Sequence, residues 1–141
     1  VELFNKKFAI PAKNLVTVML ENGLLDETKF NEEVEWTYFY LWHHEGRRAR
    51  HGAAMFAPDY VHWEGMYEMA HRFYMKMVPE IKEAIKHARE NKNAKGADIV
   101  QAALDKTLNS ELHRWFLGKE PPKFWRPTDS DNHGYVLEAK D

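Results

Sequence analysis

Cysteine is absent from all 141 residues. Without thiols the chain can form no disulfide, no thiolate metal site and no iron–sulfur cluster. It also cannot carry covalently attached c-type haem, because the C-x-x-C-H attachment motif needs two thiols for each haem. The sequence therefore predicts no covalently bound redox cofactor.

Long apolar runs and serines are also scarce. No run approaches the roughly 20 apolar residues that a membrane-spanning helix needs, so we expect no membrane insertion. Ser110 and Ser130 are the only serines, and both lie in polar surroundings. No glycine-rich loop that could hold a phosphate occurs. These absences leave little support for a serine hydrolase or a nucleotide-binding enzyme.

Neither sign of charge predominates, because 20 Lys and Arg residues face 22 Asp and Glu residues and give a formal net charge of −2. Such a chain has no general electrostatic attraction to nucleic acid or to anionic membranes. Aromatic residues, by contrast, are abundant at 13%. They are favoured at partner-facing surfaces as well as in cores. The length suits one domain with a sizeable core.

Helical periodicity dominates the first half of the chain. Residues 1–10 are short and mixed and predict an arm, and Pro11 then suits the first turn of a helix over about 11–22 that stops at Gly23. Asn31 is predicted to cap a second helix that runs to Phe56. The aromatic run of this helix is apolar nearly all round, so we expect it to be covered on more than one side.

Pro58 predicts the start of the next helix, which Pro79 should kink or interrupt. A last helix is predicted over about 97–117, ending at Gly118. Residues 119–141 contain three prolines and are expected to be extended. The sequence thus predicts an all-α fold, with an antiparallel bundle of long helices as a single helical domain over 1–118 and an extended C-terminal tail over 119–141.

Residues 42–68, WHHEGRRARHGAAMFAPDYVHWEGMYE, concentrate histidine, arginine and aromatic side chains around one proline. On a helix His44, Arg47 and His51 share one face. Such a cationic face can bind carboxylates or haem propionates, which arginine holds bidentately. The alternative is that the arginines pair with acidic residues inside the bundle, namely Glu45, Glu64 or Glu68.

Metal-ligand patterns in this stretch are incomplete. Glu68 and His71 form an E-x-x-H sequence, which is half of the di-iron motif of helical bundles, but no second such motif follows. A zinc ion could also be held by two of four histidines, although their spacing matches no known signature. These are His43, His44, His51 and His62. The sequence therefore predicts no metal site.

The same stretch carries a resemblance to a known family. WHHEGRRARHGAAM followed closely by PDYVHWEGMYE resembles the C-terminal helical region of the octahaem hydroxylamine oxidoreductase family, which includes the hydrazine dehydrogenases. The resemblance runs from about Phe4 to about Lys86 and is specific over residues 42–68. In that family the region is a long-helix domain that follows the haem-bearing part and builds trimer contacts. Oxidative members use one of its tyrosines to crosslink a neighbouring subunit's catalytic haem, and Tyr60 is the candidate for that position.

The chain departs from the family because it lacks the haem-bearing part and every C-x-x-C-H site. The resemblance therefore implies a haem-free accessory or assembly subunit, not catalytic on its own and without a cofactor, that docks on a multihaem c-type oxidoreductase. One alternative is a separate chain of a split octahaem oxidoreductase, which supplies a tyrosine or histidines to a partner's haem site. Another is a stand-alone bundle that binds haem or metal through histidines.

The resemblance also implies a compartment and a set of contact residues. Multihaem cytochromes c mature outside the cytoplasm, so their partner is expected in the periplasm or an equivalent compartment such as the anammoxosome. Large aromatics and arginines are the usual anchors of an interface. The expected partner-binding residues are His44, Arg47, Arg48, His51, Tyr60, His62, Trp63 and Tyr67.

Overall fold

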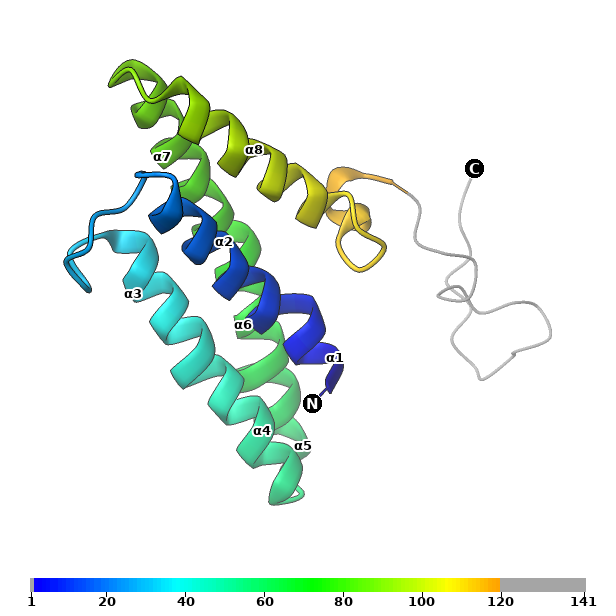
Figure 1. Cartoon of the computed structure of the whole chain (residues 1–141). Coiled ribbons are helices and arrows are strands. Elements are labelled where there is room, and N and C mark those ends of the chain that lie inside the picture. The colour runs from blue at the N-terminus through cyan, green and yellow to red at the C-terminus, as the bar shows by residue number, and fades with distance from the viewer. Residues whose placement is uncertain (1, 120–141) are drawn as a thin grey trace. The chain divides into compact units, whose positions relative to one another are not determined.

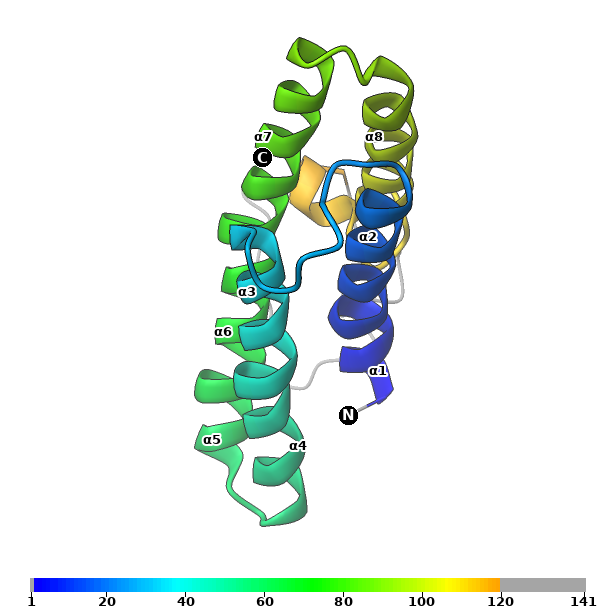
Figure 2. The ribbon, with the colours of Figure 1, turned by 60° about the vertical axis from the view of Figure 1, so that its left-hand side comes forward.

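The structure, a computed structural model, describes residues 2–119. The chain divides into two compact units, Val1–Thr107 and Leu108–Asp141. Residues 2–107 of the first unit form four continuous helices that run alternately up and down as an antiparallel bundle (Figure 1, Figure 2). The described residues contain no strand, and the predicted all-α bundle is confirmed. The predicted extended tail lies outside the described residues except for Lys119.

The first three helices combine α-helical segments with wider π-helical turns, which are labelled η1 to η4. The first helix consists of α1 (Glu2–Phe4), η1 (Asn5–Ala9) and α2 (Ile10–Glu21). The second consists of α3 (Glu33–Tyr40), η2 (Leu41–Glu45) and α4 (Gly46–Ala54). The third consists of α5 (Pro58–Val61), η3 (His62–Tyr67), α6 (Glu68–Arg72), η4 (Phe73–Met77) and α7 (Val78–Glu90). The fourth is α8 (Ala94–Leu108), and a short 3₁₀ helix, η5 (Arg114–Leu117), follows in the second unit.

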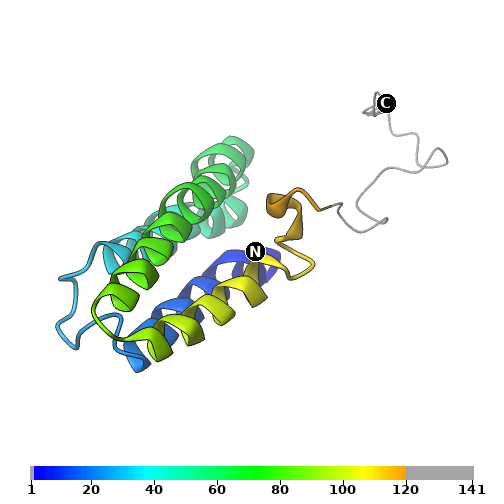
Figure 3. The same cartoon turned by 90° about the horizontal axis from the view of Figure 1, so that it is seen from above.

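The core of the first unit lies between its four helices. Figure 3 shows α2 beside α8, with α3 and α7 forming the other side of the bundle. Each helix contributes large side chains that are almost fully buried: Leu15, Met19, Leu41, Met69, Phe73, Met77, Ile81 and Leu104. Across residues 2–119 no helix is both long and apolar enough to cross a membrane.

The N-terminal residues are helical from Glu2, so the predicted arm over residues 1–10 is wrong. Phe4 and Phe8 are buried. The Phe8 ring meets the edges of Phe73 and Tyr74 at centroid distances of 5.5 and 5.8 Å. These long-range aromatic contacts stabilise a segment whose local sequence has little helical periodicity.

Gly23 ends α2 as predicted. It has a φ of 73°, and the next residue, Leu24, donates its N–H to the Met19 carbonyl over 2.9 Å. This is the hydrogen-bonding pattern of a helix end at a left-handed glycine. The predicted cap of the second helix at Asn31 is wrong, because the helix begins one residue later, after Glu32. The Glu32 N–H donates to Glu35 Oε2 over 3.2 Å, so the first turn is capped by a glutamate side chain.

The aromatic run of α3 is covered on one side only, contrary to the expectation from its composition. Val34, Thr37 and Leu41 are buried at helical spacing. Trp36 is 44% exposed, and Tyr40 is also exposed. Neighbouring rings shield each other at the surface, since the Phe30 and Trp36 centroids lie 4.7 Å apart. The apolar composition of the run therefore led us to expect more of its side chains in the core than the structure buries there.

Pro79 lies inside a continuous helix as the second residue of α7. Proline has no N–H to donate and its ring clashes with the carbonyl one turn earlier, which disfavours a regular α-helix before it. The π turn η4 occupies that position (Phe73–Met77). Pro79 therefore coincides with a local widening of the helix and does not end it.

The last helix ends at Leu108, so the prediction of a helix to residue 117 is wrong in its second half. Asn109 and Ser110 follow, and such side chains compete with the helix for backbone hydrogen bonds. The Ser110 carbonyl accepts N–H groups from His113 and Arg114 over 3.0 and 2.9 Å. A separate turn thus begins where the apolar periodicity of the sequence suggested continued helix.

Candidate partner-binding surface

A helical hairpin, residues 46–67, carries most of the predicted partner-binding residues. It comprises α4, the turn at residues 55–57, α5 and η3, and the turn extends past α1 in two views (Figure 1, Figure 2). The two helices approach so closely that a Cβ added to Gly65 would lie 2.7 Å from Ala49 Cα. One added to Gly52 would lie 2.9 Å from Val61 Cγ2. Glycine and alanine thus form the inside of the hairpin and large side chains face outwards.

Large apolar side chains run along the turn and the outer face of α5 and η3. Phe56 is 93% exposed and Trp63 is 64% exposed, and Tyr60 and Tyr67 are exposed as well. The last three recur at spacings of three and four, which places them on one helix face. We call these four residues the aromatic row. Contiguous exposed apolar surface of this kind marks an interaction site more often than a solvated face.

Phe56 is also unusual in its backbone. Its φ is 53°, a left-handed conformation that glycine adopts readily and other residues adopt at a cost. The conformation closes the turn, because Ala57 donates its N–H to the Gly52 carbonyl over 2.9 Å. Neither folding nor solubility favours an exposed phenylalanine here. Phe56 was not among the predicted contact residues, although the apolar pair Met55 and Phe56, which only Ala57 separates from the helix-starting Pro58, was a visible signal.

The three arginines of α4 have different environments. Arg48 Nη1 lies 3.6 Å from Glu64 Oε2 and 3.5 Å from Glu68 Oε2, so for Arg48 the alternative of pairing within the bundle is confirmed. The Arg50 guanidinium lies over the Trp42 ring, 4.2 Å from its centroid. Arg47 is exposed and has no ion pair with any described residue. Among these arginines, Arg47 is left for an external anion.

The predicted contact residues fall on two faces of the hairpin. Arg47 and His51 are exposed on α4, four residues apart, on the side away from the buried glycines of that helix. His44 is exposed one turn earlier, 4.8 Å from the Tyr40 ring. Tyr60, Trp63 and Tyr67 occupy the outer face of the other helix. Arg48 bridges the two helices through its glutamates, so the set does not form one cationic aromatic patch.

The histidines of the stretch are not gathered into a metal site. His62 Nδ1 lies 2.8 Å from the Pro58 carbonyl, which is a contact within its own helix turn. His71 stacks on Tyr67 at a centroid distance of 6.1 Å. Among the described residues no three His, Asp or Glu side chains are arranged to hold a metal ion. The zinc and di-iron alternatives therefore gain no support from the geometry.

A buried ion pair lies beside the aromatic row. Glu45 is only 2% exposed, and its Oε1 accepts the Arg72 Nε–H over 2.7 Å. The Arg72 guanidinium also lies 5.2 Å from the Tyr40 ring centroid. Glu45 was one of three possible acidic partners for the arginines of α4, and it pairs with Arg72 instead. The partner comes from α6, and a contact between helices is not visible in local spacing.

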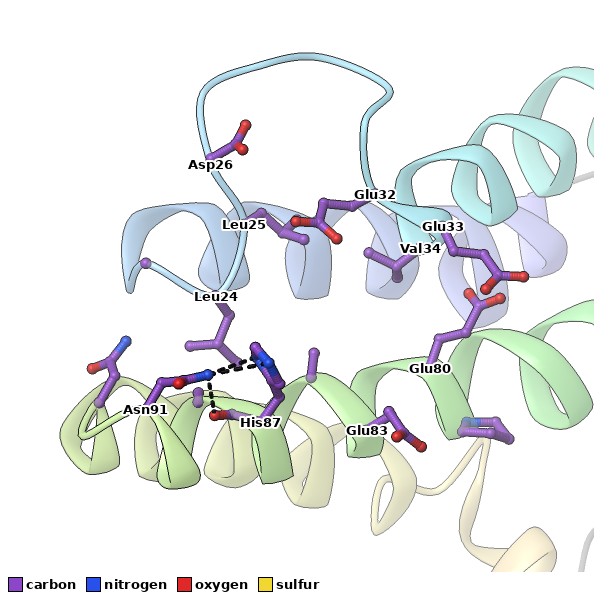
Figure 4. A pocket seen from close by; sticks show the side chains of 15 residues that line it. Leu24, Leu25, Asp26, Glu32, Glu33, Val34, Glu80, Glu83, His87 and Asn91 are labelled. Carbon is purple, nitrogen blue, oxygen red and sulfur yellow. Dashed lines mark hydrogen bonds between the residues drawn. The ribbon is translucent and has the colours of Figure 1, made fainter.

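A hollow of about 960 Å³ lies outside the hairpin, between the loop after α2 and helix α7 (Figure 4). Five carboxylates line it: Asp26, Glu32, Glu33, Glu80 and Glu83. Burial raises the pKa of Glu80 above its ordinary value, although Thr37 Oγ1 donates to Glu80 Oε1 over 3.0 Å and Lys76 opposes the shift. These carboxylates make the lining of this groove acidic. The sequence analysis did not find it, because its two walls are distant in sequence.

Comparison with known proteins returned no relative. No protein-family model, no curated protein and no solved structure matches this chain.

Proposed function

We propose that the chain is a haem-free accessory subunit that docks on a multihaem c-type oxidoreductase of the hydroxylamine oxidoreductase type. The docking surface is the aromatic row together with the turn of the helical hairpin. The observation that carries the proposal is the exposure of four large aromatic side chains within 12 residues, from Phe56 to Tyr67. In water such a surface favours aggregation unless a partner covers it.

Two further observations support this proposal. The stretch that resembles the octahaem family, residues 42–68, coincides with the helical hairpin. In that family the corresponding region makes contacts between subunits, so a detached copy can use the same surface against a haem-bearing chain. The absence of cysteine means that any covalently bound haem in the complex belongs to the partner. A partner of a multihaem cytochrome c is expected outside the cytoplasm.

A split enzyme is the second candidate, and Tyr60 is the residue that favours it. Its side chain is exposed, and its hydroxyl makes no hydrogen bond to any described residue. A tyrosine that crosslinks a haem on another chain must be reachable and must lose its free phenol. Intact-mass measurement of the denatured chain separates the candidates. The bare mass of the sequence supports the accessory subunit, and an added haem-bearing peptide supports the split enzyme.

The docking surface is tested by capture of the oxidoreductase. A tagged chain is purified from its source under native conditions, and the captured proteins are separated on a denaturing gel stained for haem. We expect a haem-positive band whose peptides contain several C-x-x-C-H sites and which is absent with Trp63→Ala. The matched control is Trp36→Ala, which removes a similarly exposed tryptophan from α3, outside the hairpin.

Charge reversal gives an independent test of the same surface. Arg48→Glu places a third negative charge beside Glu64 and Glu68 and should also release the partner. Arg89→Glu is its control, because Arg89 makes a more exposed ion pair with Asp98 on α8, outside the hairpin. Helix content measured by circular dichroism should be similar in both variants. If Trp63→Ala and Arg48→Glu both capture as much haem protein as their controls, the docking surface lies elsewhere.

A further inference from the structure

The carboxylate of Glu45 is satisfied on one side only. Its Oε1 is bound by Arg72 Nε, whereas its Oε2 is buried and has no hydrogen-bond partner. Buried carboxylate oxygens are normally paired, because removal from water is costly unless donors replace it. Arg72 contacts the carboxylate through Nε alone, and the position of its guanidinium at the Tyr40 ring holds it in that orientation. The second oxygen therefore keeps its capacity to accept a hydrogen bond from another donor.

Glu45 also lines a hollow at the surface, which we call the Glu45 hollow. It has a volume of about 540 Å³ and is lined by Glu45, Tyr67, Glu68, His71, Arg72, Met75 and Lys76. Tyr67 belongs to the aromatic row and stacks on His71, so the hollow continues the proposed docking surface. Tyr67 is 57% exposed and Met75 is exposed too, so a group from outside can reach the mouth of the hollow.

The charges of the lining favour a cationic donor. Its arginine and lysine are engaged, since Arg72 binds Glu45, and Lys76 Nζ lies 3.3 Å from Glu33 and 3.8 Å from Glu80. The third basic residue of the lining, His71, stacks on Tyr67. Glu68 is held only by Arg48 at 3.5 Å and keeps much of its acceptor capacity. An incoming carboxylate would meet two carboxylates of the wall, whereas an N–H donor would meet acceptors.

We propose that the Glu45 hollow is an anchor pocket for a guanidinium group, supplied by an arginine of the docking partner. The planar group donates an N–H to Glu45 Oε2 and a second one towards Glu68, and its face lies against the Tyr67 ring. An ammonium group has neither the fork of donors nor the flat face. The identity of the donor as a partner's arginine rests on the proposed function, whereas the pocket is a property of this chain alone.

The pocket is tested on the isolated chain with ethylguanidinium as the probe, by nuclear magnetic resonance. Titration should shift the Arg72 Nε–H and the Tyr67 ring resonances in a saturable way. Ethylammonium should shift them less at equal concentration, and acetate should not shift them. Saturable shifts from acetate, equal shifts from ethylammonium, or no saturable shift from ethylguanidinium would each overturn the proposal.

Three variants locate the binding. Glu45→Gln presents an amide to the donor and should lower the apparent affinity at least tenfold, whereas Glu83→Gln in the acidic groove should leave it unchanged. If Glu45→Gln does not fold, Tyr67→Leu gives the same information, because it removes the stacking surface from an exposed position. If Tyr67→Leu, or Glu45→Gln when it folds, binds ethylguanidinium as tightly as the unsubstituted chain does, the assigned pocket is wrong.

The outcome is separable from that of the proposed function. If ethylguanidinium binds as expected but no haem protein is ever captured, the pocket stands and the accessory role fails. If Trp63→Ala releases the haem protein while Tyr67→Leu and Glu45→Gln capture it fully, the docking surface stands. In that case the partner's arginine does not occupy the Glu45 hollow, and this inference fails.

Discussion

Replacing Phe56 with glycine should make the isolated chain more stable while weakening its docking. The left-handed backbone at φ 53° costs a residue with a Cβ about 1–2 kcal/mol, and glycine relieves that cost. Glycine also gains more freedom in the unfolded chain, which opposes the relief by about 0.5–1 kcal/mol. Loss of the ring costs little, because the side chain is 93% exposed. The net expectation is a stabilisation of about 0.5–1 kcal/mol.

Phe56→Ala is the matched control, since it removes the same ring but keeps the Cβ and therefore the backbone strain. Urea denaturation followed by far-ultraviolet circular dichroism gives the free energy of unfolding of all three proteins, with equal slopes if the unfolded states are alike. Phe56→Gly should be more stable than Phe56→Ala, and both should capture less haem protein than the unsubstituted chain. If the two variants have equal free energies of unfolding, the backbone of Phe56 is not strained. If both capture as much haem protein as the unsubstituted chain, the turn does not contact the partner.

Other predictions concern the packing, the buried ion pair and pH. Gly65→Ala brings a Cβ within 2.7 Å of the facing backbone and should lower the free energy of unfolding in urea by about 1–3 kcal/mol, even though alanine is the better helix former. Arg72→Met leaves Glu45 buried without its cation and should cost about 3 kcal/mol, most of which the double variant with Glu45→Gln should restore. The pKa of Glu80 is raised above 4.5, so the folded state binds more protons than the unfolded state, and stability is lost as pH rises from 4.5 through the raised value. Glu80→Gln should remove that loss. The free energy of unfolding of the Glu80→Gln variant, relative to that of the unsubstituted chain, should therefore increase between pH 4 and pH 7. If this difference in stability does not change with pH, the pKa of Glu80 is not raised in the folded state.

The sequence predicted features of the fold that depend on local chemistry. Gly23 and Pro58 end and begin helices as expected, because a left-handed glycine and a first-turn proline act through their own backbone. Phe8 and Leu108 were misjudged for the opposite reason. Phe8 is ordered by rings that lie far away in sequence, and α8 ends at Leu108 although apolar residues continue beyond it. Tertiary contacts and competition for backbone hydrogen bonds leave no periodic signal.

The candidate site was likewise predictable in part. The spacing of Tyr60, Trp63 and Tyr67 places them on one helix face, and the structure leaves that face exposed. Phe56 belongs to the same surface, yet it lies in a turn where helical periodicity gives no information. Glu45 was one of three acidic residues considered as partners for the neighbouring arginines, but which partner a glutamate meets depends on how two helices face each other. The relative orientation of two helices cannot be predicted from the spacing of residues in a single sequence.

The glycine and alanine contact inside the helical hairpin has a consequence for how such a surface can change. Gly52 and Gly65 let the two backbones meet closely, so the large outer side chains contribute little to holding the helices together. Substitution of Tyr60 or Trp63 then alters what the hairpin recognises without altering its shape. Most helical pairs use their largest side chains to stay folded and cannot exchange them freely. Here the outer side chains, and with them the partner, can change during evolution while the backbone of the hairpin remains the same.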